Sequence, residues 1–141
     1  MRNFENIAMK LLKFYNLKSN LIFDKISFNG KYDVDNDIIY IHKSLTGKDF
    51  FMSILHEIDH AITCKKMGKD EYKKDYELEI ERCIISDLDP YHDNYYEIQA
   101  ENFATKEVKK LYCANYNRSK KIIWWLYHIK KQIKRRIKNE F

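Results

Sequence analysis

Glycine, proline and cysteine are scarce in this chain of 141 residues, which contains three glycines, one proline and three cysteines. So few glycines and prolines leave little material for turns and irregular loops, and the sequence therefore favours mostly helical structure. The cysteines, Cys64, Cys83 and Cys113, are odd in number and form no Cys-x-x-Cys pair. Neither a disulfide scaffold nor a zinc ribbon is therefore expected.

Long apolar segments are absent as well. No run of 18 apolar residues occurs, so no transmembrane helix is predicted. The first residues lack the apolar core of a signal peptide, and we expect a protein of the reducing cytoplasm. Hydrophobic residues make up 45% of the chain and charged residues 33%, which is the composition of a globular domain rather than of a disordered segment.

Positive charge is concentrated near the end of the chain. Residues 117–141 contain nine lysines and arginines against one glutamate, whereas the net charge of the whole chain is only +5. The body is therefore mildly acidic. We predict one domain over residues 1–118 and a basic amphipathic helix over residues 119–141 that docks on it. This helix could also contact nucleic acid, an anionic membrane surface or an acidic partner, although no helix-turn-helix or other reading motif is apparent.

Hydrophobic periodicity predicts an α+β fold. Residues 21–42 alternate as strands do, with turn signals at Asn29-Gly30 and at residues 35–37, so we expect a small antiparallel β-meander whose third strand is Ile38–Ile41. Residues 69–89 are ambiguous, with helix favoured over strand. Helices are predicted over about residues 3–17, over 48–67 with Gly68 at the end, from Asp89-Pro90 to about 112, and over 119–138.

Residues 56–60 read His-Glu-Ile-Asp-His in the middle of an apolar predicted helix. His56 and His60 lie one turn apart on the same face, where both imidazoles can bind one metal ion. Glu57 is rotated by about 100° and can reach a metal-bound water without ligating the metal. Chance supplies such a match about once in a hundred sequences, but burying these groups without a purpose would cost on the order of several kcal/mol. The motif predicts a zinc metallopeptidase with Glu57 as general base.

A catalytic zinc ion needs a third protein ligand from elsewhere in the chain. Lys66 stands where the metzincin pattern has its last histidine, so that arrangement is excluded. His-Glu-x-Asp-His is also the helix motif of peptide deformylases, but that family takes its third ligand from an upstream cysteine and none precedes Cys64. The remaining candidates are Glu97, which lies one helical turn before Glu101, and His92 as the alternative ligand.

The segment from Glu97 to Ala104, Glu-Ile-Gln-Ala-Glu-Asn-Phe-Ala, resembles the gluzincin pattern Glu-x-x-x-Asp. It also resembles the second motif of ImmA/IrrE-family metallopeptidases, small cytoplasmic proteins common in phages and mobile elements. The resemblance covers about residues 30–110 and implies a minimal zincin-like domain. It also implies that Glu97 is the third zinc ligand beside His56 and His60, and that Glu101 orients a metal-binding histidine. The family usually has Asn or Asp at the position of Glu101, and Gly or Ala at that of Asp59.

These observations predict a peptidase, and more specifically an endopeptidase that cleaves one polypeptide substrate. An extended substrate is expected to pair along the strand Ile38–Ile41, and Tyr91, Tyr95 and Tyr96 are candidate oxyanion donors. Two other interpretations stay open, a catalytically silent zincin-fold interaction module and a nucleic-acid accessory protein that acts through residues 119–141. The intact Glu57 favours the enzyme, because a binding module needs no general base.

Overall fold

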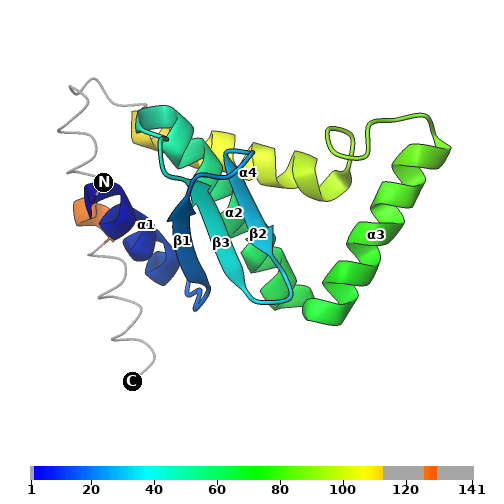
Figure 1. The fold of residues 1–141 in the computed structure, drawn as a ribbon, viewed down its shortest axis with the longest axis horizontal. Coiled ribbons are helices and arrows are strands. Elements are labelled where there is room, and N and C mark those ends of the chain that lie inside the picture. Colours follow the sequence, from blue (N-terminus) through cyan, green and yellow to red (C-terminus); the bar gives the residue numbers. More distant parts are fainter. Residues whose placement is uncertain (1, 113–125, 130–141) are drawn as a thin grey trace.

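The computed structural model describes residues 2–112 and 126–129 of the chain, and it places helices around a small three-stranded sheet (Figure 1). The predicted α+β class is therefore confirmed. The elements are α1 (Arg2–Phe14), β1 (Asn20–Asp24), β2 (Gly30–Asp33), β3 (Ile38–His42), α2 (Gly47–Met67), α3 (Lys69–Ile85) and α4 (Tyr95–Tyr112).

The sheet is mixed, and the predicted antiparallel meander is wrong. The strand order is β1-β3-β2, with β1 parallel and β2 antiparallel to β3. Residues 35–37 form the turn between β2 and β3 as predicted, whereas Asn29-Gly30 does not join two paired strands. The most apolar strand, β3, takes the centre, where Ile39 and Ile41 are fully buried and both strand edges are paired. The more polar strands β1 and β2 become the edges.

Helix α2 is the centre of the hydrophobic core. Its buried face includes Phe50, Phe51 and Ile54, which pack with residues of α1, β3 and α4. Gly68 ends the helix, as predicted, and its N–H donates to the Cys64 carbonyl at 2.9 Å. With a φ of 91°, Gly68 adopts a conformation that other residues rarely take, and α3 begins at the very next residue.

Helix α3 resolves the ambiguous stretch in favour of helix. It forms a V with α2 and reaches away from the sheet (Figure 1). Only Tyr72 and Cys83 are buried along it, while Leu78, Ile84 and Ile85 are exposed. The helix thus packs on the body mainly through one short face.

The predicted helix start at Asp89-Pro90 is wrong, since α4 begins only at Tyr95. The carboxylate of Asp89 accepts hydrogen bonds from the backbone N–H groups of Tyr91 and His92, each at 2.8 Å, which fixes a turn instead of a helix. Asn94 then caps α4, because its side-chain oxygen accepts the Tyr96 N–H at 2.9 Å.

The predicted basic helix lies within the described residues only at 126–129, which are helical. Ile129 is buried in the core cluster together with α1 residues, and Leu126 packs against the same cluster. The rest of residues 119–141, and the boundary at 118, lie outside the described residues. Among the described helices, none combines the length and apolar character needed to cross a membrane.

Candidate metal centre

Helices α2 and α4 bring together His56, His60 and Glu97. One ligand atom from each lies within 4.8 Å of the others. The Nε2 atom of His56 is 2.9 Å from Glu97 Oε2 and 3.2 Å from the Nε2 atom of His60, which is 3.3 Å from Glu97 Oε1. The fully buried Ala100, on the same helix as Glu97, provides the small side chain that a close approach of two helices requires.

The donor set fits a zinc ion. Atoms that each lie about 2.0–2.1 Å from a tetrahedral zinc are separated from one another by about 3.3 Å. The separations above, which involve both oxygens of Glu97, are 2.9, 3.2 and 3.3 Å and lie close to this value. Without a metal ion, each Nε2–H can donate to one oxygen of Glu97, but two protonated Nε2 atoms only 3.2 Å apart cannot bond each other, and a cation shared by both nitrogens and the carboxylate would use all of these groups.

The opposite nitrogen of each histidine is also held. Nδ1 of His56 lies 3.3 Å from the Glu101 carboxylate, the place expected of a residue that orients this ligand. Nδ1 of His60 lies 3.0 Å from the buried Tyr72 hydroxyl. With Nε2 directed to a metal, Nδ1 carries the proton and donates it to these oxygens.

Two tyrosines of α3 belong to the site, and the sequence analysis did not identify them. Tyr72 contacts His60, and the Tyr76 hydroxyl donates to Glu97 Oε1 at 2.5 Å. A signal was present in the sequence, because residues 72 and 76 share one face once the stretch is taken as a helix.

Charges within the cluster shift the pKa values of its members. Burial acts to raise the pKa of Glu97, but hydrogen bonds from His56 and His60 outweigh it and hold that pKa well below its usual range. Burial acts to lower the pKa of His56, while its hydrogen bond to Glu97 and the charge of Glu57 outweigh it, so the pKa of His56 is raised. In the absence of a metal ion, the two groups therefore form an ion pair.

Glu57 lies between the metal ligands and strand β2, with only 6% of its surface exposed. Burial raises the pKa of its carboxyl group, opposed by the nearby imidazoles of His60 and His56 and by a hydrogen bond from the Tyr32 backbone. Gly30 borders it so closely that a Cβ added to this glycine would lie 3.0 Å from Glu57 Cγ. The general-base candidate is thus confined between α2 and β2.

The open edge of the sheet beside Glu57 belongs to β2, so the predicted pairing of a substrate along β3 is wrong, because β3 is central. The His42 N–H donates to Asn29 O at 2.8 Å, and hydrogen-bonded pairs alternate with non-bonded ones along an antiparallel ladder. In the register Gly30↔Ile41 and Tyr32↔Ile39, the backbone groups of Gly30 and Tyr32 therefore point away from β3. The Tyr32 bond to Glu57 agrees with this direction.

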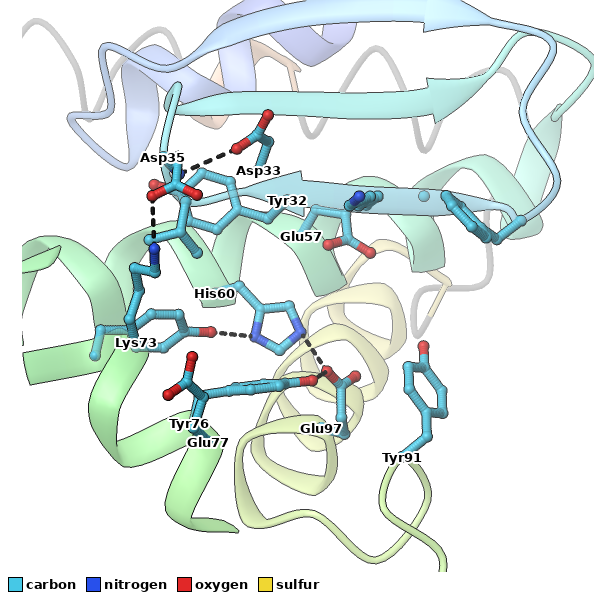
Figure 2. Close-up of a pocket in the computed structure, with 15 residues that line it drawn as sticks. Tyr32, Asp33, Asp35, Glu57, His60, Lys73, Tyr76, Glu77, Tyr91 and Glu97 are labelled. Atoms are coloured by element: carbon cyan, nitrogen blue, oxygen red, sulfur yellow. Dashed lines mark hydrogen bonds and ion pairs between the residues drawn. The ribbon is translucent and has the colours of Figure 1, made fainter. Parts of the chain in front are cut away.

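Two pockets flank the cluster. The larger, about 550 Å³, lies between β2 and α3 and includes Glu57, His60, Tyr76 and Glu97 in its wall (Figure 2). The smaller, about 380 Å³, is bordered by His56, Glu101 and His92. His92 thus lies near the site but is not part of the cluster of ligand atoms, and the structure does not bring it to the position of the third ligand.

Tyr91 lines both pockets, and Figure 2 shows it on the side of Glu97 opposite to Tyr76. Burial, the nearby Glu97 and other carboxylates raise the pKa of Tyr91 to about 12, so its hydroxyl stays protonated at neutral pH. The Tyr96 hydroxyl is engaged elsewhere, with Asp75 of α3, and Tyr95 borders neither pocket. Of the three candidate oxyanion donors, Tyr91 is the one placed at the site.

Two further residues of α2 serve the packing. Asp59, the unusual residue of the first motif, accepts a hydrogen bond from Gln99 of α4 at 3.0 Å. Gln99 also contacts Thr63 of α2 at 3.0 Å, so this link joins the two ligand-bearing helices. Cys64 is buried in a cluster with Tyr72 and Tyr96, as expected of a small apolar residue.

Comparison with known proteins adds no family assignment. No protein-family model matches the chain, and no curated protein or solved structure matches it either. The case for a metal centre therefore rests on the side chains of α2, α3 and α4 and on their geometry.

Proposed function

We propose that this chain is a small zinc-dependent metallopeptidase of the ImmA/IrrE-like, gluzincin type, acting in the cytoplasm. The observation that carries the proposal is the cluster of His56, His60 and Glu97 with the Glu57 carboxylate beside it. A metal-binding structural site does not need a carboxylate next to its ligands. An open strand edge and a pocket at the same place support a polypeptide substrate.

In the proposed mechanism, His56, His60 and Glu97 hold the zinc ion, with Glu101 fixing the orientation of His56. A zinc ion bound there would supply Lewis acidity and would make the attacking water easier to deprotonate. Glu57 accepts a proton from the attacking water and returns it to the leaving amine.

Residues that line the site bind the substrate and stabilise its carbonyl oxygen. An extended peptide pairs with the outward backbone groups of Gly30 and with the outward carbonyl of Tyr32, whose N–H already donates to Glu57, and this places the peptide carbonyl carbon beside Glu57. Tyr91 donates a hydrogen bond to the carbonyl oxygen as negative charge develops there. The larger pocket then receives a substrate side chain between β2 and α3.

The direct test compares the wild type with Glu57→Gln. Purified wild type should bind about one zinc ion per chain. The variant should keep that zinc, because Glu57 is not a ligand, but should lose at least about 100-fold in cleavage rate. Cleavage is measured by mapping new peptide termini in a whole-proteome digest, which works for a substrate of any sequence.

The matched control is His60→Ala, which should lose both zinc and cleavage. Full proteolytic activity of Glu57→Gln would overturn the mechanism. Zinc binding without any cleavage by the wild type would instead identify a silent zincin-fold interaction module.

A further inference from the structure

Helix α3 lies in the chain between the two ligand-bearing helices and returns to the metal centre through two tyrosines. Tyr72 and Tyr76 are four residues apart and therefore share one face of the helix. One hydroxyl meets Nδ1 of His60 and the other meets Glu97 Oε1. Two of the three ligands thus have a hydrogen-bond partner on the same short surface of α3.

These contacts decide where the ligand atoms point. His60 can turn about its side-chain bonds unless Nδ1 is fixed, and the Tyr72 hydroxyl is the partner that the structure gives to that nitrogen. The Glu97 carboxylate has one oxygen on His56 and the other on Tyr76 and His60, which fixes the plane of the group.

Outside this surface, α3 is joined to the start of α4 by two hydrogen bonds, from the Tyr95 N–H to Glu79 and from Arg82 to the Asp93 carbonyl, and Cys83 is buried. Tyr72 and Tyr76 pack with Tyr96, whose hydroxyl bonds Asp75 of α3, and Lys73 pairs with Asp35 at the exposed surface. Ile84 and Ile85 are 62% and 85% exposed and add no burial. The helix leaves α2 at Gly68, where an added Cβ would meet nothing within 4 Å. Across the angle between the two helices, Cys64 of α2 and Tyr72 of α3 lie in one buried cluster.

We propose that Tyr72 and Tyr76 are positioning residues of the metal centre, and that docking of α3 and binding of the metal ion are thermodynamically coupled. The inference rests on the proposed metal site but not on peptidase activity. Coupling is reciprocal by necessity: if docked α3 holds the ligands in their binding geometry, the bound ion in turn favours the docked helix. The helix is therefore part of the site and also one wall of the substrate pocket.

The first test measures zinc affinity by competition with a chromophoric chelator. Tyr72→Phe and Tyr76→Phe should each weaken zinc binding about 10–100-fold, because loss of the partner of a metal ligand has an effect of this size. Tyr95→Phe is the matched control, since that exposed ring borders neither pocket and contacts no ligand, and it should bind zinc as the wild type does. Cobalt bound in place of zinc should show an altered visible spectrum in the two variants only.

The second test separates docking from positioning. Tyr96→Phe removes the bond to Asp75 but leaves both ligand contacts in place, so it should weaken zinc binding by a smaller factor than either ligand-contacting variant. In the wild type, zinc should slow amide hydrogen exchange along residues 69–85. This measurement needs no variant and decides the question even if a tyrosine substitution prevents folding.

The outcomes are distinct. A wild type without measurable zinc affinity would overturn the metal centre and, with it, the proposed function. Zinc binding that is equal in wild type, Tyr72→Phe and Tyr76→Phe, or that leaves exchange in residues 69–85 unchanged, would overturn the inference alone. A protein that binds zinc, shows the coupling and cleaves nothing would overturn the peptidase and leave the inference standing.

Discussion

At the scale of single residues, Gly30 matters because it has no Cβ, which leaves space for the neighbouring Glu57 side chain. A Cβ there would lie 3.0 Å from Glu57 Cγ, 3.1 Å from Glu57 Oε1 and 3.3 Å from Ile41 Cδ1. The first two contacts involve the group that we propose as general base. Gly30 therefore keeps the room in which the carboxylate sits, and its backbone also forms part of the open edge.

Gly30→Ala should lower the catalytic rate while leaving zinc affinity close to that of the wild type, because the new methyl group displaces Glu57 and not a ligand. Overpacking of this kind also costs about 1–3 kcal/mol of stability. Steady-state kinetics, chelator competition and urea unfolding measure the three quantities. A large loss of zinc affinity would contradict this placement of Glu57.

The ion pair between His56 and Glu97 makes the stability of the metal-free protein depend on pH. The pKa of Glu97 is lowered from 4.5, so its contribution is complete above that value and is lost as the pH falls through the lowered folded-state pKa. The pKa of His56 is raised from 6.5, so its contribution is complete below that value and is lost as the pH rises through the raised folded-state pKa.

Metal-free protein should therefore lose stability as the pH rises from 6.5 through the raised pKa of His56. The measurement is urea unfolding at a series of pH values in the presence of a chelator. Glu97→Gln should flatten this part of the profile, because the imidazolium then lacks its partner. An unchanged slope in the variant would show that another group causes the dependence.

At the scale of elements, the contact between α2 and α4 sets the site. The distances from Glu97 to both histidines depend on how these two helices are placed. Hydrogen bonds from Gln99 of α4 to Asp59 and Thr63 of α2 hold the helices together. The small Ala100 and Ala104 are fully buried on α4. Asp59 thus acts in this chain as a structural acceptor.

Gln99→Ala should destabilise the protein by about 1–3 kcal/mol, because it leaves the buried Asp59 carboxylate without its donor. Lys106→Ala, at an exposed position of the same helix, is the control and should change stability by less than about 0.5 kcal/mol. Urea unfolding measures both. A coupling energy near zero in the double-mutant cycle of Asp59→Ala with Gln99→Ala would contradict the link.

Local chemistry explains which elements could be predicted. Helix α2 and its end at Gly68 followed from periodicity and from a residue that tolerates positive φ, and both need only neighbouring residues. The strand order could not be predicted in the same way. β1 pairs with β3 and not with β2, the next strand in the sequence, and this choice depends on contacts between residues far apart in the chain. The start of α4 was predicted too early. The Asp89 carboxylate accepts hydrogen bonds from two backbone N–H groups and forms a turn there, and the helix begins only after its cap at Asn94.

At the scale of the whole molecule, the structure brings together residues from three helices that are separate in sequence. His56 and His60 could be predicted because their residue type and i,i+4 spacing carry metal chemistry on their own, whereas the prediction of Glu97 came from the resemblance of residues 97–104 to the gluzincin pattern. Tyr72 and Tyr76 could not, because a tyrosine has no such signature and its role depends on where α3 folds back. The metal centre thus includes residues of α3 that lie outside the two sequence motifs.

Zinc should stabilise the folded protein as a whole. A ligand that binds only the native state at about 100 times its dissociation constant adds about 2.7 kcal/mol. The wild type should therefore unfold at a higher temperature with zinc than with a chelator, as calorimetry measures. His56→Ala combined with His60→Ala should show no such difference, and a zinc effect that persists in this variant would point to binding elsewhere.

The open edge of β2 has a consequence for self-association. Unpaired backbone groups that accept a substrate strand accept any extended segment, including one from another copy of the chain, and such edges promote aggregation. Here the edge strand is only four residues long and carries the charged Lys31 and Asp33. A short, charged edge strand pairs poorly with the strands of other copies. The edge of β2 can therefore stay exposed without promoting the growth of fibrils.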